Sequence, residues 1–216
     1  MINASAENLA PRSVHDVYAE GQRYFMGQGQ LHGALAQLSA DLKQHGIDYI
    51  VIGAVALMAH GYPRFTEDID LVLTQAGLET FHRELVGLGY APAFQGARKR
   101  LRATRANVPV EVIVAGEYPG DGQPKPVAFP VPATAATEID GVRFVTLEKL
   151  IELKLASGMT APDRLKDLAD VQELIKLRRL AADFAERLNP YVRAQFLTLC
   201  RAVEQARQNS ITDERE

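Results

Sequence analysis

Two aspartates separated by one residue, Asp68 and Asp70, are the residues of this sequence whose types and spacing best suit chemistry. They stand at the start of an apolar run, residues 68–73, that has the alternation of a β-strand. Side chains two apart on a strand point to the same face, so the two carboxylates can share a bound metal ion. Hard carboxylate oxygens suit Mg²⁺, which supports phosphoryl-type transfer. The structural alternative is a solvated strand entrance at which Asp68 serves a turn.

A third carboxylate, Glu111, interrupts an otherwise apolar strand predicted over residues 108–114. Burial of an unpaired charge is costly, and a neighbouring metal ion would remove that cost. If this strand lies beside the strand of Asp68 and Asp70, three carboxylates converge and can hold two cations that clamp the attacking and leaving oxygens. The alternative is a buried ion pair between Glu111 and an arginine such as Arg102.

Other residues could contact a phosphate. Gly53 and Ala54 stand between a predicted strand, residues 48–52, and a predicted short helix, residues 55–60. A glycine there allows close approach of the backbone, and the exposed amides at a helix start can receive a phosphate. Lys154 falls on the apolar stripe of a later helix, where its amine either extends to water or, at the rim of a cleft, meets a triphosphate.

The elements that must position these side chains alternate between helices and strands before the sequence becomes helical. Besides the segments above, we predict helices at residues 31–45 and 78–88, strands at 98–105 and 142–145, and a Pro- and Gly-rich surface segment at 116–137. Beyond residue 145 the pattern is helical, with Thr146 and Thr160 as expected amino-terminal caps. The expected fold class is α/β (α+β), a mixed sheet flanked by helices and followed by a C-terminal helical region.

The chain has 216 residues, of which 47% are hydrophobic, and this is enough for one well-packed core. We expect an N-terminal extension over residues 1–30, a core domain over residues 31–145 and a C-terminal helical region over residues 146–216. No run approaches the roughly 20 apolar residues that span a bilayer, and the start of the chain lacks the apolar segment of a signal peptide. We therefore expect a cytoplasmic protein with no membrane partner.

The formal net charge of -3 gives no global basic field, so a nucleic-acid partner would need a local basic patch. Arg98, Arg100 and Arg102 alternate along a predicted strand and could offer such a stripe. More often a stripe of this kind is a solvated strand face. Without interleaved aromatic residues for base stacking, it supports an RNA acceptor only weakly.

Gly53-Ala54, followed by Asp68-Ile69-Asp70 and a later strand acid, resembles the signature of the nucleotidyltransferase superfamily. The surrounding sequence resembles the abortive-infection (AbiEii-like) type of nucleotidyltransferase, a group that includes toxins of toxin–antitoxin pairs. The blocks that carry this resemblance are residues 52–57, 60–61, 64–70, 150–154 and 164–171. They stand in the order of the family and cover residues 48–175 in scattered pieces.

The resemblance implies a nucleotidyltransferase-type sheet with Asp68, Asp70 and Glu111 as metal ligands for Mg²⁺, with two ions expected. It also implies that these three acids and Lys154 are the catalytic residues. Glu111 replaces the commoner aspartate of the family, and its extra methylene changes where the carboxylate can reach.

The resemblance further implies a nucleoside triphosphate as co-substrate. Gly53 and Ala54 would face the triphosphate, Arg64 and Thr66 would lie near the nucleotide, and Arg164 would approach its phosphates together with the lysine. Ala54 replaces the second glycine or serine of the usual pair. The alternatives from the residues alone are a surface charge for Arg64 and, for Arg164, a pair with the acid three positions later on its helix.

The activity that this resemblance implies is transfer of a nucleoside monophosphate from the triphosphate to an acceptor, with release of pyrophosphate. The acceptor is left open between an RNA end such as that of tRNA, a protein hydroxyl and a small molecule. A toxin of this group would have a cognate antitoxin as partner, and a homo-oligomer is also left open. The alternative, suggested by Ala54 and Glu111, is a noncatalytic nucleotide-binding or interaction module of the same fold.

Overall fold

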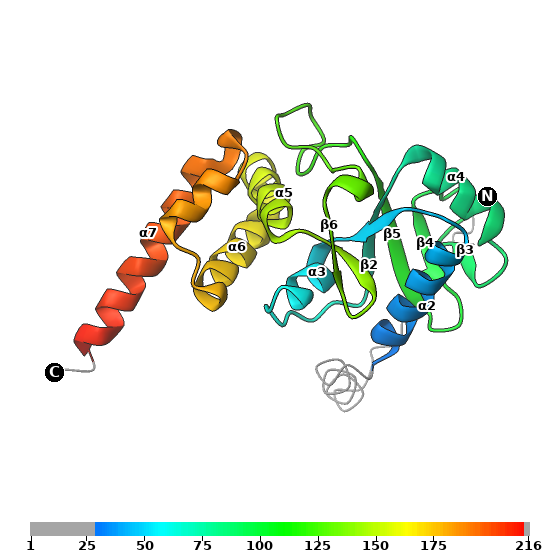
Figure 1. Ribbon diagram of the computed structural model, residues 1–216, viewed down its shortest axis with the longest axis horizontal. Helices are drawn as coiled ribbons and strands as arrows, with labels where there is room; N and C mark the ends of the chain where they lie inside the picture. Colours follow the sequence, from blue (N-terminus) through cyan, green and yellow to red (C-terminus); the bar gives the residue numbers. More distant parts are fainter. Residues whose placement is uncertain (1–28, 214–216) are drawn as a thin grey trace, which may run out of the picture.

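The computed structural model describes residues 29–213, in which a seven-stranded mixed sheet is flanked by helices and followed by a C-terminal helical region (Figure 1). This arrangement confirms the expected fold class. Of the extension expected over residues 1–30, only the last two residues lie in the described range. None of the helices in residues 29–213 combines the length and the apolarity that crossing a membrane requires.

The sheet has the strand order β3-β4-β5-β2-β1-β7-β6. Two strand pairs are parallel, β2 with β5 and β1 with β7, and the remaining neighbours are antiparallel. The central strands β2 and β5 carry the acidic residues singled out above. The strands are β1 (Tyr49–Val51), β2 (Ile69–Leu73), β3 (Tyr90–Pro92), β4 (Arg100–Ala103), β5 (Val108–Val114), β6 (Ala136–Ile139) and β7 (Val142–Val145).

Helix α5 lies at the junction between the sheet and the C-terminal helices, because it contacts α3, α6 and α7. Figure 1 shows α7 extending from this junction away from the sheet. The α-helices are α2 (Gln30–Gln44), α3 (Gly53–Ala59), α4 (Gln75–Glu84), α5 (Leu147–Thr160), α6 (Leu165–Arg178) and α7 (Pro190–Asp213). Three 3₁₀ turns complete the described elements, η1 (Pro132–Thr134), η2 (Pro162–Arg164) and η3 (Ala182–Arg187).

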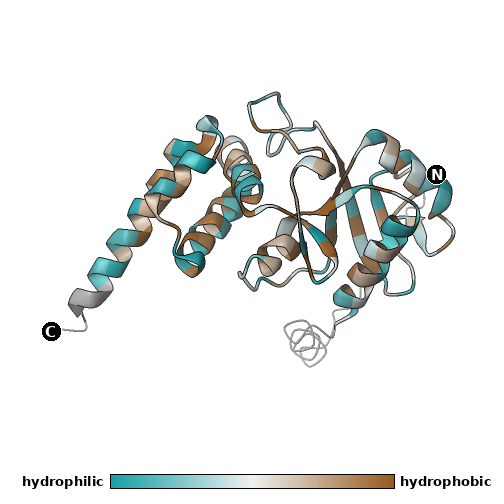
Figure 2. Ribbon diagram, viewed as in Figure 1, coloured by the Kyte–Doolittle hydropathy of each residue, from teal (hydrophilic) through white to brown (hydrophobic). Residues whose placement is uncertain are grey.

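Apolar periodicity predicted the core elements well. In α2, the leucines at three- and four-residue spacing, Leu31, Leu35, Leu38 and Leu42, are all buried. On β2, successive residues from Leu71 to Leu73 are fully buried, so apolar groups cover both faces of the central sheet. Figure 2 shows hydrophobic residues concentrated on these strands, whereas the outer part of α7 is mainly hydrophilic.

Several local expectations were wrong. Helix α4 begins at Gln75, earlier than the expected residue 78, because the Thr74 hydroxyl accepts a hydrogen bond from the Gly77 amide and caps it. Thr160 caps no helix start: it is the last residue of α5 and donates to the Ala156 carbonyl. Strand β3 was not predicted, and β6 begins inside the segment expected to be irregular. Both lie at the edges of the sheet, where the polar alternation is weak.

Candidate active site

The pairing of β2 with β5 places two of the predicted acids side by side. The strands are parallel and in register, with Asp70 opposite Glu111, so both side chains project from the same face of the sheet. The condition stated above for these acids to converge, that the two strands are neighbours, is therefore met. On the other side of β5, Arg100 of β4 is opposite Glu111 and belongs to the same row.

Asp70 has the strongest electrostatic perturbation of the acids on this face. Burial raises the pKa of its carboxyl to about 7, with further upward contributions from the negative charges of Asp68 and Glu111. Lys154 and Arg164 lower the pKa, but by less. Among residues 29–213, no group donates a hydrogen bond to this carboxylate or forms an ion pair with it. It is an acid held among like charges, a condition that a bound cation would relieve.

Asp68 stands one residue before β2 and accepts a hydrogen bond from the Thr66 hydroxyl. This bond fixes the turn into the strand, as the structural alternative for Asp68 requires. Its charge nevertheless acts on Asp70, whose pKa it raises. Asp68 therefore contributes to the negative potential of the site from the turn before β2.

The expected burial of Glu111 is wrong, because its side chain is 48% exposed. It lies 3.9 Å from Arg100 Nε, whereas Arg102, the alternative partner, binds Asn107. Exposure to water removes the desolvation cost from which a metal ion at Glu111 was inferred. In the described part of the chain, no three side chains of the His, Cys, Asp or Glu types are grouped closely enough to hold a metal ion.

Gly53, the first residue of α3, lies directly against Asp70. Its φ of +67° is in the left-handed region, and a Cβ atom built on it would overlap the Asp70 carboxylate. The glycine expected to make room for a phosphate thus makes room for the acid itself. Ala54, the next residue, is partly buried within α3 and does not line the pocket described below.

Substitution of Gly53 by alanine is expected to cost more stability than the same change at Gly46. Both residues have similar φ values, +67° and +64°, at which an L side chain costs about 1–2 kcal/mol. Nothing lies within 4 Å of a Cβ at Gly46, whereas one at Gly53 would displace the Asp70 carboxylate. Urea denaturation of both variants measures the difference. Equal losses in the free energy of unfolding would show that the Asp70 side chain can move away from a Cβ atom at Gly53 without cost.

A second set of charges faces these acids from the helices. Lys154 on α5 is buried, and its Nζ lies 2.8 Å from Asp167 Oδ1 and 2.7 Å from Asp170 Oδ2, both on α6. The Ser157 hydroxyl donates to Asp167 at 2.7 Å, and Arg164 Nε does so at 2.8 Å. The pairing of Arg164 with the acid three positions later is therefore present. Lys154 is on the inward face of α5, as expected, but its ammonium group is paired with these two aspartates.

Asp167 is ionised because its partners outweigh its burial. Burial alone would raise the pKa of its carboxyl, but the charge and hydrogen bond of Lys154, the hydrogen bond of Ser157 and the charge of Arg164 together lower it. This carboxylate is only 1% exposed. A buried, ionised and fully hydrogen-bonded acid at this position fixes α6 against α5.

Arg64 is not a free surface charge. Its Nη1 lies 2.5 Å from Asp170 Oδ2, so the segment before β2 is joined to α6. Sequence reasoning included Asp170 in the block of residues 164–171 that carries the resemblance, but gave it no role. The available signal was the spacing of Asp167, Asp170, Val171 and Leu174, which places two acids on the buried stripe of α6.

The acidic and the basic sets meet at a pocket of about 420 Å³. Its walls come from β2, β5, the start of α3, the helices α5 and α6, and the loop over residues 115–131. Asp68, Arg64 and Thr66 do not line it. The lining residues that bear charge are Asp70, Glu111, Glu117, Lys154, Asp163, Arg164 and Asp167.

No protein-family model matches this chain, and no curated protein matches it. Among solved structures, it is similar to an antigenic nucleotidyltransferase-like protein from Paracoccidioides brasiliensis, with 18% identity and a TM-score of 0.45 over 68% of this chain and 76% of that one.

A second similar structure is ANT(2'')-Ia in complex with an adenylyl-tobramycin, with 15% identity and a TM-score of 0.47 over 82% of this chain and 98% of that one. The solution structure of the same antibiotic-resistance factor has 14% identity and a TM-score of 0.49 over 91% and 98%. The first of these neighbours is named as a nucleotidyltransferase-like protein, but with identities of 14–18% and TM-scores of 0.45–0.49 the likeness is distant. The function must therefore be argued from the side chains of this chain.

Proposed function

We propose that this protein is a nucleotidyltransferase, which moves a nucleoside monophosphate from a nucleoside triphosphate to an acceptor and releases pyrophosphate. The observation that carries the proposal is a single pocket with Asp70 and Glu111 on its sheet side and Lys154 and Arg164 on its helix side. Such a transfer needs acids that hold a divalent cation and cationic groups that neutralise phosphate charge. The motif order that resembles the nucleotidyltransferase superfamily supports the same activity.

The acids would hold Mg²⁺ through Asp70, with Asp68 and Glu111 as further ligands for one or two ions. The fit rests on Asp70, whose pKa of about 7 reflects burial and neighbouring negative charge. Carboxylate oxygens on one face of a sheet are suitable donors for this hard cation. Bound Mg²⁺ supplies positive charge that polarises the phosphoryl group and stabilises the departing pyrophosphate.

The chain's own cations would bind and orient the triphosphate. Arg164 uses its Nε in the bonds to Ser157 and Asp167, and its side chain is 43% exposed, so the rest of the guanidinium can reach a phosphate at the pocket. Lys154 adds positive charge to the same wall, although its Nζ is paired with two aspartates. Arg64 and Thr66 act indirectly in this scheme, because they fix α6 and Asp68 respectively.

A noncatalytic nucleotide-binding module is the second candidate. Two observations favour it: Asp167 and Asp170 already neutralise the buried lysine, and the acids of the described residues do not form a three-ligand cluster. Such a module would bind a nucleoside triphosphate without releasing pyrophosphate. Toxin activity, and with it an antitoxin partner, depends on the sequence resemblance alone.

The test is label transfer from each of four α-labelled nucleoside triphosphates, with cell extract as the source of acceptors and with Mg²⁺ or EDTA. We expect a labelled product and pyrophosphate release that need Mg²⁺. Digestion of the product with ribonuclease or protease then identifies the acceptor as RNA, protein or a small molecule. Nucleotide binding without transfer under any of these conditions would favour the noncatalytic module, and absence of binding would exclude both.

A further inference from the structure

We propose that Tyr118 is the surface on which the base of the bound nucleotide stacks. The inference rests on the proposed function and names a residue that recognises the nucleoside part of the substrate. It comes from the loop over residues 115–131, which leaves the pocket end of β5 and forms one wall of the pocket with Tyr118 and Phe129.

The loop brings these two aromatic residues close together in the chain path. The Gly116 amide donates to the Phe129 carbonyl at 2.8 Å, and the Phe129 amide donates to the Glu117 carbonyl at 2.8 Å. These two backbone bonds close the base of the loop like a short antiparallel ladder. Tyr118 and Phe129 therefore lie on the two opposite sides of the loop, and Tyr118 directly follows the residue whose carbonyl accepts from Phe129. Both residues line the pocket.

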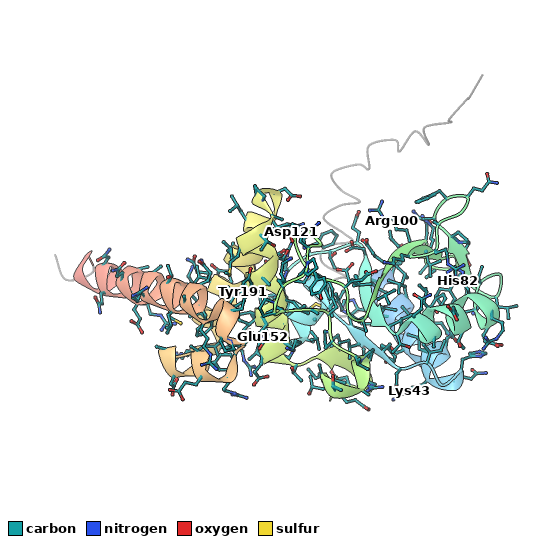
Figure 3. The ribbon with its side chains drawn as sticks, turned by 90° about the horizontal axis from the view of Figure 1, so that it is seen from above. Lys43, His82, Arg100, Asp121, Glu152 and Tyr191 are labelled. Carbon is teal, nitrogen blue, oxygen red and sulfur yellow. The ribbon has the colours of Figure 1, made fainter. Side chains whose placement is uncertain are left out.

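The loop is fixed in place. Lys125, whose side chain is 5% exposed, donates to the Pro119 carbonyl at 2.7 Å and pairs with Asp121. Gly120 packs so closely on α5 that a Cβ atom there would overlap the Thr160 hydroxyl. Figure 3 shows Asp121 beside this helix. An aromatic ring carried by a fixed loop loses little conformational freedom when a ligand stacks on it.

The chemistry of the wall suits a base. Between the charged groups, the pocket is lined by apolar side chains, including Ile113, Leu150 and Leu153 as well as the two rings. The metal ion and the phosphates of a substrate would contact the charged groups, not this apolar wall. A nucleobase suits the wall, because every base has a flat π-face that stacks on aromatic rings. Lys125 Nζ lies 6.0 Å from the centroid of the Tyr118 ring, which holds the ring by a cation–π contact.

The experiment compares binding of α,β-methylene ATP and α,β-methylene CTP with binding of inorganic tripolyphosphate, measured by calorimetric titration with Mg²⁺. Tyr118→Ala should weaken binding of both nucleotide analogues about tenfold, because stacking tolerates every base, and leave tripolyphosphate binding unchanged. Tyr118→Phe keeps the ring and should bind within about twofold of wild type. Phe94→Ala, which removes a ring that is 59% exposed and outside the pocket, is the matched control.

Tyr118→Leu separates stacking from apolar packing, and it should behave like Tyr118→Ala. Wild-type affinity in either of these two variants would overturn the inference and leave the proposed function standing. A parallel loss of tripolyphosphate affinity would also overturn it, since the effect would then lie in the loop structure. If the wild-type protein binds neither analogue, the proposed function itself is contradicted, and the inference about Tyr118 falls with it.

Discussion

Asp70→Asn is expected to lower nucleotidyl transfer by about a thousandfold, since a metal ion supplies several kcal/mol of transition-state stabilisation and each 1.4 kcal/mol is tenfold in rate. Asp70 lines the pocket, is largely buried and, among residues 29–213, has neither a hydrogen-bond donor nor an ion pair for its carboxylate. Asparagine keeps its size and removes its charge. The measurement is label transfer at saturating Mg²⁺, with circular dichroism to verify the fold.

The matched control is Asp48→Asn. This aspartate precedes β1, is 62% exposed and pairs with Arg143 away from the pocket, so its replacement should leave transfer unchanged. A fully active, Mg²⁺-dependent Asp70→Asn variant would remove the acid from the proposed site and, with it, the assignment of Mg²⁺ to this face of the sheet.

Asp70 also gives a readout that does not depend on activity. Its folded pKa of about 7 lies above the ordinary 3.8, so the folded state binds the proton more tightly and stability falls as pH rises between these values. The cost is absent below pH 4 and complete above pH 7, where it reaches about 4 kcal/mol. In EDTA, Asp70→Asn should therefore match wild type near pH 4 and exceed it at pH 8.

Added Mg²⁺ should narrow this difference by stabilising wild type and not the variant. Urea denaturation at the two pH values, with and without Mg²⁺, measures both effects. A wild-type protein whose stability does not respond to Mg²⁺ at pH 8 would contradict the metal assignment even if transfer were observed.

Lys154→Met is expected to destabilise the protein by about 3–5 kcal/mol, because it leaves buried carboxylates without their central cation. Lys154 Nζ contacts both Asp167 and Asp170, which are 1% and 5% exposed. Because the pKa of Asp167 is lowered in the folded state, its ionised carboxylate stabilises the fold at pH values above its ordinary pKa. That stability is lost as pH falls through the lowered pKa. The variant should therefore lose more stability at pH 7 than at pH 3.

Lys43→Met is the control for this change. Lys43 lies 3.7 Å from Glu138, with both side chains more than half exposed, and such surface pairs contribute less than about 1 kcal/mol. The double variant Lys154→Met with Asp167→Asn should recover part of the loss, since one buried charge is then removed. A loss at Lys154 no larger than that at Lys43 would be incompatible with a buried charge network.

Sequence spacing predicted the acids better than their surroundings. Two aspartates separated by one residue were expected to share one strand face. Asp70 lies on β2, where the register with β5 places Glu111 beside it, whereas Asp68 lies in the turn before the strand. The expected burial of Glu111 was wrong, because one acid in an apolar strand does not reveal whether that face of the sheet is covered by other elements. That face of β5 opens to the pocket, which leaves Glu111 half exposed.

Helix periodicity placed Lys154 on the inward face of α5, but it could not identify the partners. The helix α6 brings Asp167 and Asp170 to the lysine from 13 and more residues along the chain, so the pairing depends on how two helices pack. In the same way, Gly53 was expected to favour a phosphate, whereas its φ and its contact with Asp70 show that the neighbouring strand requires it.

The sequence by itself determined most of the order of strands and helices, the apolar core positions and the place of Asp70 on an apolar strand, because periodicity and spacing are local properties. Tertiary structure alone decided which strands are neighbours, which charges are buried and which cation meets which acid. These properties depend on contacts between distant segments, and burial changes the energy of a charge far more than any sequence neighbour does. The pocket between Asp70 and Arg164 is a consequence of those contacts.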